Sequence, residues 1–272
     1  MTVSKNINKN IIIGAATGYQ KKDLFYFVET ARKVFSGRIV LIVNNKINSE
    51  TNHYLNRKKI DLFFTKSTSR TIYKDRYQIY LDIVKNNKNL ENIMLTDTKD
   101  VIFQNDPFLN KNLTKLNFFL EDKLITNCAT NTRWIIRAYG NNIYNKIMNK
   151  RISCSGVTIG HKKEILKYCN QMVLEIKNKK YYSLNPFNKG SDQGNHNIIV
   201  NSSKFKMARK FLNIDSFVVN LSNSKENILK YTNGKFSINK KTISVIHQYD
   251  SHELIEKNVQ NLISKLQSGS IN

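Results

Sequence analysis

The stretch IIIGAATGYQKKDLFYFVETARKVFSGRIVLIV, residues 11–43, decides the fold class of this 272-residue chain. It begins and ends with runs rich in Ile and Val, at 11–16 and 38–43, which are typical of strands buried on both faces. Between them, from Asp23 to Phe35, apolar residues recur at helical spacing, and Gly37 ends the pattern. A buried strand, an amphipathic helix and a second buried strand predict a parallel sheet covered by helices on both faces.

The same alternation continues to residue 96 and then becomes less regular. Up to that point we expect two further strands, at 60–64 and 92–96, and helices at 50–57 and 71–84. The later expected elements are strands at 116–120 and 152–159 around a mostly helical stretch at 134–148, a helix at 162–177, short strands near 217–221, 236–238 and 242–246, and a final helix at 251–266. Because no linker divides them, we predict one α/β domain over residues 1–272, with a Rossmann-type mixed sheet flanked by helices.

The net charge of +24 does not by itself indicate a nucleic-acid partner. The chain has 35 Lys but only 9 Arg, together with 38 Asn and 32 Ile. Lys, Asn and Ile share codons rich in A and T, so base composition explains much of the excess. The lysines are also scattered, whereas a nucleic-acid-binding protein concentrates its charge on one face. We therefore do not expect nucleic acid as a partner, and keep only a modest attraction to phosphorylated ligands or anionic membrane surfaces.

Nothing in the sequence predicts a membrane span or a secretory signal. No apolar run approaches the roughly 20 residues that a membrane helix needs, and residues 1–10 are polar. Cys128, Cys154 and Cys169 form no CxxC pair, which favours a reducing compartment over a disulfide framework or a zinc site. We expect a cytoplasmic protein, with peripheral attachment at a membrane surface left open.

Two aspartates stand directly after the expected strand at 92–96. Asp97 and Asp100 lie three residues apart at the carboxyl end of that strand, where ligands bind in open parallel sheets. Two carboxylates so close together repel each other unless a cation lies between them, and Mg²⁺ or Mn²⁺ prefers such oxygen ligands. The alternative is a solvated turn that Asp97 caps.

Three later segments add candidate site residues, and each also has a structural explanation. Small residues interrupt an apolar strand at 154–160 (CSGVTIG), which either lets another group approach the backbone or serves only packing. Ser191 or Asp192 opens a helix and is either an N-cap or a site residue. His247 ends a strand, where a lone His is more often structural than a metal ligand.

Together and in this order, the segments resemble a group of GT-A-type glycosyltransferases. Residues 96–108 (TDTKDVIFQNDPF) are similar to that group's TDxRDVxFQxDPF segment, and residues 154–160 to its CSGVTIG strand. Asp192-Gln193 matches its DQ helix start, and residues 247–252 (HQYDSH) match its HQYDRH segment, with Ser251 in place of Arg. The resemblance covers roughly residues 11–252.

The resemblance implies a metal-dependent, hexosyltransferase-like enzyme. Its donor would be a nucleotide-sugar, with a UDP-sugar expected, and its acceptor a glycan, a glycoprotein or a glycolipid. Mn²⁺ or Mg²⁺ would bridge the donor diphosphate. It also divides the domain into a nucleotide-binding half at about 1–103, a half for the donor sugar and the acceptor at about 104–252, and a C-terminal helix and tail at 253–272.

The resemblance also assigns roles to single residues. Asp97, Asp100 and His247 would hold the metal. The spacing is DxxD rather than DxD, and Asp100 is preferred because its distance to Asp106-Pro107-Phe108 matches that of the family's second aspartate; Asp97 would bind the metal or the ribose. The other implied contacts are with the donor or the acceptor: Ala15, Ala16 and Thr17 with the nucleotide, Arg76 with phosphate, Ser155 and Gly156 with the sugar, Gln193 with the donor, and Asp192 with a sugar hydroxyl or as general base.

Two other functions remain open. The DxxD spacing and Ser251 are compatible with a catalytically inactive GT-A-fold interaction module. The scattered lysines are compatible with a basic protein that binds nucleic acid or a membrane surface.

Overall fold

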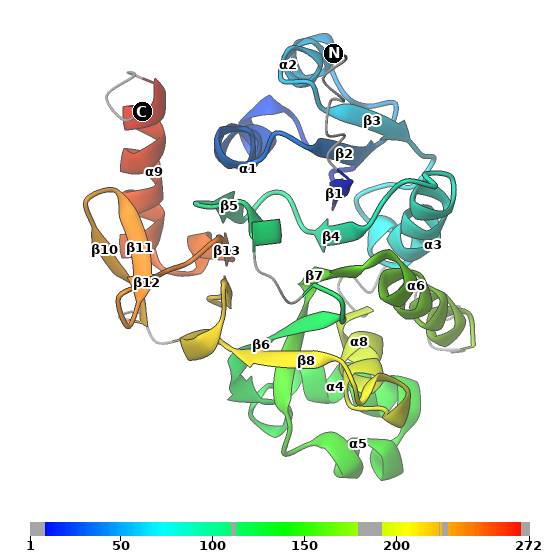
Figure 1. The fold of residues 1–272 in the computed structure, drawn as a ribbon. Coiled ribbons are helices and arrows are strands. Elements are labelled where there is room, and N and C mark those ends of the chain that lie inside the picture. Colours follow the sequence, from blue (N-terminus) through cyan, green and yellow to red (C-terminus); the bar gives the residue numbers. More distant parts are fainter. Residues whose placement is uncertain (1–8, 110–112, 179–191, 223, 225–227, 268–272) are drawn as a thin grey trace, which may run out of the picture.

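A computed structural model describes residues 9–109, 113–178, 192–222, 224 and 228–267 (Figure 1). The chain forms a mixed α/β domain around a seven-stranded sheet with the order β3-β2-β1-β4-β7-β6-β8, compatible with a Rossmann-like fold. This confirms the predicted fold class. Ser191, the alternative helix cap, lies outside the described residues. Within those residues, no helix is both long enough and apolar enough to cross a bilayer.

The first half alternates strands and helices as its sequence pattern predicts. All its strand pairings are parallel, from β3 at the edge to β4 in the centre of the sheet. The elements are β1 (Asn10–Ala15), α1 (Lys21–Val34), β2 (Arg38–Val43), α2 (Ser49–Arg57), β3 (Asp61–Phe64), α3 (Ile72–Lys85) and β4 (Asn92–Thr96).

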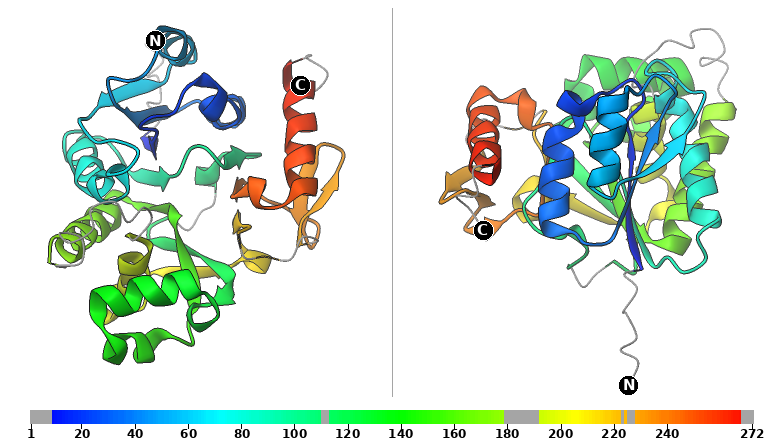
Figure 2. Two further views of the ribbon diagram at one scale, coloured as in Figure 1. Left: turned by 180° about the vertical axis from the view of Figure 1, so that it is seen from behind. Right: turned by 90° about the horizontal axis from the view of Figure 1, so that it is seen from above.

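Two apolar layers cover the faces of this sheet. On one face, Leu24 and Phe27 of α1 and Leu55 of α2 are fully buried against the sheet. On the other face, Tyr80 of α3 and Met172 of α6 (Lys162–Lys177) fill the core. The view from above shows these helix pairs on opposite sides of the strands (Figure 2). Ile and Val on both faces of the strands explain the near-continuous apolar runs in the sequence.

The second half adds strands that run in both directions. β7 (Arg151–His161) is antiparallel to both β4 and β6 (Asn117–Leu124), and β8 (Arg209–Leu212) extends the sheet beyond β6. The stretch 134–148 is mostly helical, as predicted, but it belongs to two helices, α4 (Ala129–Tyr139) and α5 (Asn141–Ile147). Gly140 separates them with a φ of +78°, a conformation that residues with a Cβ rarely adopt.

A small second sheet lies beside the main one and supplies part of the site. It has the order β5-β13-β9, formed by β5 (Val101–Phe103), β13 (Val245–His247) and β9 (Val218–Asn220). The strand predicted at 242–246 therefore divides between β12 (Lys241–Thr242) and β13. The sequence patterns did not predict the short strands β5, β8 and β10 (Lys230–Thr232). β12 belongs to a third sheet, β10-β11-β12 with β11 at Lys235–Ile238, next to α9 (Glu253–Gln267) (Figure 1).

Candidate metal centre

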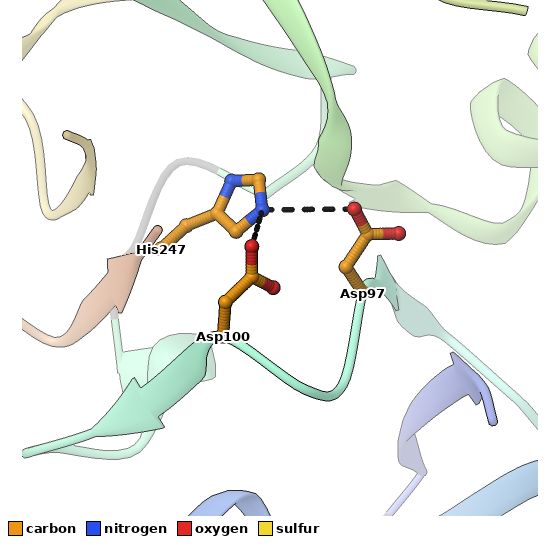
Figure 3. Close-up of side chains that lie close together, drawn as sticks. All are labelled: Asp97, Asp100 and His247. Atoms are coloured by element: carbon orange, nitrogen blue, oxygen red, sulfur yellow. Dashed lines mark ion pairs between the residues drawn. The ribbon is translucent and has the colours of Figure 1, made fainter. Parts of the chain in front are cut away.

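Asp97, Asp100 and His247 converge at the carboxyl end of β4. Nε2 of His247 lies 3.6 Å from Oδ2 of Asp97 and 3.6 Å from Oδ2 of Asp100. Figure 3 shows the carboxylates of Asp97 and Asp100 pointing at the same ring nitrogen of His247. Asp97 comes from the loop after β4, Asp100 from the start of β5 and His247 from the end of β13. One ligand atom of each residue lies within 4.8 Å of the other two.

The backbone holds these three residues in place. The N–H of Asp97 donates to the carbonyl of Gly156 at 2.7 Å, and the N–H of Gln248 donates to the carbonyl of Asp100 at 2.7 Å. His247 pairs with Val101 across the antiparallel ladder of β5 and β13. The second sheet therefore carries a residue that is 147 positions from Asp100 in the chain to the same point as the two aspartates.

Asn220 orients the His247 ring. Nδ2 of Asn220 donates to the carbonyl of Phe119 at 3.1 Å, so its Oδ1 faces Nδ1 of His247 at 2.8 Å. A carbonyl oxygen only accepts, and Nδ1 therefore carries the proton. In the neutral ring, Nε2 would then present its lone pair towards the two carboxylates, where a bound cation could be shared by all three groups.

Burial and charge give each of these groups a shifted pKa. Burial would raise the pKa of Asp97, but the guanidinium of Arg76 and the His247 ring lower it to about 2. Burial raises the pKa of Asp100, and the Asp97 carboxylate adds to the rise while His247 opposes it. Burial lowers the pKa of His247, yet Cys154 and the two carboxylates raise it well above its usual value. Burial also raises the pKa of the Cys154 thiol, so this group is neutral. The charge that stabilises a protonated His247 ring therefore comes from the carboxylates of Asp97 and Asp100.

The residues fit a divalent cation. Nε2 of His247 is buried and has no hydrogen-bond partner among the described residues. Two ligands that share one cation through bonds of about 2.1 Å lie roughly 3 to 3.5 Å apart, close to the separations seen here. Gly156 leaves this space open: a Cβ there would lie 2.7 Å from Nε2 of His247 and 2.8 Å from Oδ2 of Asp97.

The buried Arg76 joins the partly exposed Asp97 to the buried Asp192 through two ion pairs. Its Nη1 donates to Asp97 at 2.7 Å, and its Nη2 donates to Asp192, which opens α8 (Asp192–Val200). Tyr77 also donates to Asp192, at 2.9 Å, and Asp192 is 1% exposed. The terminal nitrogens of Arg76 are thus engaged by carboxylates. This geometry makes Arg76 a positioning residue for Asp97 and Asp192, and the contact with phosphate that the resemblance implied stays a prediction.

Ser155 and Gly156 lie where the ladder between β6 and β7 is broken. Phe118 pairs with Thr158 but Leu120 pairs with Ser153, so two steps along β6 correspond to five along β7. Such bulges often accompany active sites. Gln193 repairs the gap with its amide, which accepts from the N–H of Ser155 at 2.8 Å and donates to the carbonyl of Ser153. Gln193 therefore supports the predicted sugar-site residues directly.

A cavity of about 640 Å³ opens beside the three metal-ligand candidates. Ala15, Thr17 and Tyr19 line one side of it, and Oγ1 of Thr17 is buried without a hydrogen-bond partner among the described residues. Ala16 does not line the cavity: its side chain is 1% exposed within the apolar core, and its N–H donates to Ile42. The other predicted site residues on its wall are Arg76, Asp97, Asp100, Ser155, Gly156, Asp192 and Gln193.

Sequence reasoning missed several residues of the site. Asn220 ends the apolar run Val218–Asn220, and Glu121 follows the apolar run 116–120, so a polar residue at the end of a buried strand was the available signal. Trp134 also lines the cavity, but within a helix no sequence signal separates a cavity residue from a core residue. No model of a known protein family matches the chain, and no curated protein matches it. Function is therefore argued from the geometry of the site.

Proposed function

We propose that this chain is a metal-dependent glycosyltransferase that moves a sugar from a nucleotide-sugar, in the first instance a UDP-sugar, to a glycan, protein or lipid acceptor. One observation carries the proposal: two carboxylates and a preoriented imidazole meet at the carboxyl end of β4, beside a cavity of about 640 Å³. Cavities of this size accommodate cofactor-sized ligands, and this edge of the sheet is where α/β domains bind them.

Asp97, Asp100 and His247 would hold Mn²⁺ or Mg²⁺. Two carboxylate oxygens suit either ion, and the neutral imidazole nitrogen favours Mn²⁺. When bound, the cation neutralises the charge that develops on a departing nucleoside diphosphate. Lys99, exposed on the cavity wall between the two aspartates, supplies a further positive charge for phosphate that Arg76 is not free to supply.

The other walls of the cavity suit the remaining parts of the donor. Ala15 and Thr17 lie on the cavity wall where a nucleotide would approach the end of β1. Ser155 and Gly156 lie on the cavity wall beside the metal centre, where the donor sugar would bind. Asp192, held in place by Arg76 and Tyr77, would accept hydrogen bonds from sugar hydroxyls.

The test is metal-dependent donor binding and turnover. With Mn²⁺, we expect one member of a UDP-sugar panel to raise the melting temperature and to be hydrolysed slowly to UDP. Asp100→Asn should abolish both effects, whereas Asp215→Asn should change neither, because Asp215 is an exposed aspartate in the turn after β8 and does not line the cavity. If Asp100→Asn hydrolysed the donor as fast as the unmodified protein, the assigned metal centre would be wrong. A chain that binds the donor but never turns it over would be an inactive interaction module.

A further inference from the structure

Asn213 is a buried polar residue between two exposed apolar ones. It begins the short helix η4 (Asn213–Asp215), which follows β8, and it is fully buried, whereas Leu212 is 37% and Ile214 is 50% exposed. Burying an amide costs free energy unless its hydrogen bonds are made, and exposed Leu and Ile side chains forgo the stabilisation that burial gives. The chain thus turns a polar side chain inward here, which directs attention to the partners of that amide.

The side-chain amide of Asn213 binds both backbone groups of Asn220. Its Oδ1 accepts from the N–H of Asn220 at 3.0 Å, and its Nδ2 donates to the carbonyl of Asn220 at 2.9 Å. Nδ2 also donates to Oδ2 of Asp122 in β6, at 3.1 Å. One donor on one side and two acceptors on the other fit a single orientation of the amide. Asp122 therefore helps to fix Asn213, and Asn213 fixes the backbone of Asn220.

These bonds replace a neighbouring strand on the outer side of β9. In the order β5-β13-β9, β9 lies at the edge of the second sheet and pairs with β13. The N–H of Leu221 donates to the carbonyl of His247 at 3.1 Å, so the backbone groups of Asn220, the residue before it, face away from β13. Backbone groups on the outer side of an edge strand need a partner when they are buried. Asn213 supplies that partner and ties the second sheet to the main one.

One hydrogen bond carries the position of Asn220 to the metal centre. Oδ1 of Asn220 faces Nδ1 of His247 at 2.8 Å, and the two residues are paired in the ladder of β9 and β13. Because a hydrogen bond weakens steeply when its length and angle change, a displacement of β9 would release the ring. Asn213 itself neither lines the cavity nor belongs to the cluster of Asp97, Asp100 and His247.

We propose that Asn213 is a positioning residue of the metal centre, which acts on His247 through Asn220. The inference rests on the metal centre of the proposed function and extends the arrangement that holds it. A hydrogen-bonded series runs from the exposed Asp122 through both asparagines to the ring of His247. Residues that orient a metal-binding His from outside the ligand set influence metal affinity. The alternative is that Asn213 only closes the loop between η4 and β9.

A double-mutant cycle on the affinity for Mn²⁺, measured by calorimetry, separates these two roles. Asn213→Ala should lower the affinity about 5-fold or more, and Asn220→Ala about 10- to 100-fold. If Asn213 acts through Asn220, the double variant should bind Mn²⁺ as tightly as Asn220→Ala alone, because the path is already broken. If the two losses multiply instead, Asn213 loosens the fold in general and the assignment is overturned.

Asn117→Ala is the matched control for the cycle. Asn117 is also a buried asparagine, and its amide donates to the carbonyls of Lys115 and Ile159 at the start of β6, both at 3.0 Å. Its variant should lose unfolding free energy but keep the affinity for Mn²⁺. Asn213→Asp, which keeps the size and an acceptor oxygen but loses the Nδ2 donor, takes the place of Asn213→Ala if that variant does not fold. An affinity in the Asn213 variant equal to that of Asn117→Ala would overturn the assignment.

The ring proton of His247 provides a readout that needs no metal. In the metal-free protein, the Nδ1–H that faces Asn220 should give a ¹H–¹⁵N NMR signal protected from exchange with water, identified by its absence in Asn220→Ala. The signal should also be lost in Asn213→Ala and remain in Asn117→Ala. Its persistence in Asn213→Ala would overturn the inference alone, whereas an unmodified protein that binds no Mn²⁺ would overturn the proposed metal centre and this inference together.

Discussion

Oδ1 of Asn220 faces Nδ1 of His247 at 2.8 Å and thereby determines which ring nitrogen is free. The amide cannot turn over without losing the bond from its Nδ2 to the Phe119 carbonyl. A strand residue outside the cluster of Asp97, Asp100 and His247 thus prepares Nε2 for a cation.

Removing this orienting amide should weaken metal binding. In Asn220→Ala, the His247 ring loses its partner, and we expect the affinity for Mn²⁺, measured by calorimetry, to fall about 10- to 100-fold. Asn56→Ala on the exposed face of α2 is the control. An affinity in Asn220→Ala equal to that of the control would mean that His247 does not depend on Asn220, or is not a ligand.

Gly156→Ala should disturb the metal centre as well as the fold. The new Cβ would lie within 3 Å of Nε2 of His247 and Oδ2 of Asp97, so we expect a loss of about 1–3 kcal/mol in unfolding free energy together with weaker Mn²⁺ binding.

The control for that variant is Gly140→Ala between α4 and α5. Its positive φ makes the substitution cost about 1–3 kcal/mol as well, but no atom outside its immediate chain neighbours lies within 4 Å of the new Cβ. Denaturant unfolding and calorimetry should show destabilisation in both variants and weaker metal binding only in Gly156→Ala. Equal metal affinity in the two variants would contradict the conclusion that the missing side chain of Gly156 leaves space for the metal centre.

Arg76→Met should be strongly destabilising because it leaves Asp192 buried without its counter-charge. Breaking one partner of a buried ion pair costs about 3–5 kcal/mol, measured here by urea unfolding. Adding Asp192→Asn removes the orphaned charge and should restore part of the loss. A double variant no more stable than Arg76→Met would show that the Arg76–Asp192 contact does not carry this energy.

His196 should make the protein lose stability in acid. It is fully buried between Ser153 and Tyr168, and burial, with the charge of Arg76 adding to it, lowers the pKa of His196 to about 3. In the unfolded chain its pKa is about 6.5, so below that pH only the unfolded state takes up the proton. The contribution of neutral His196 is therefore complete above about pH 6.5 and declines as the pH falls towards 3.

The expected slope is about 1.4 kcal/mol per pH unit for one proton. His196→Gln should lack this part of the pH dependence, so the difference in unfolding free energy between the two proteins should shrink from pH 6 to pH 4. Parallel curves over that range would show that His196 is not neutral in the folded state.

The main sheet follows from local pattern. Runs of Ile and Val alternate with amphipathic stretches from Ile11 to Thr96, and each pattern is satisfied by neighbours a few dozen residues away. For the same reason the position of Asp97 and Asp100 was predictable, since a polar pair directly after a buried strand must lie at the edge of the sheet where that strand ends. The helix break at Gly140 is the local feature that periodicity alone did not reveal.

The chemistry of the site depends on contacts between distant parts of the chain. His247 joins Asp100 only because the three-residue strands β5, β13 and β9 pair, and the sequence pattern, which predicted strands near β9 and β13, does not determine which strands pair. The engagement of Arg76 by Asp192 spans 116 positions, and the break in the ladder beside Ser155 is repaired by an amide 38 positions away.

Sequence pattern was therefore sufficient to predict the layers of the fold and the position of Asp97 and Asp100 in the site. Tertiary structure decided which nitrogen of His247 is free, that Arg76 positions carboxylates, and that Glu121 and Trp134 face the same cavity. The physical reason is that hydrophobic periodicity reports only burial along one element, whereas hydrogen bonds and ion pairs require two side chains whose separation only the folded chain determines.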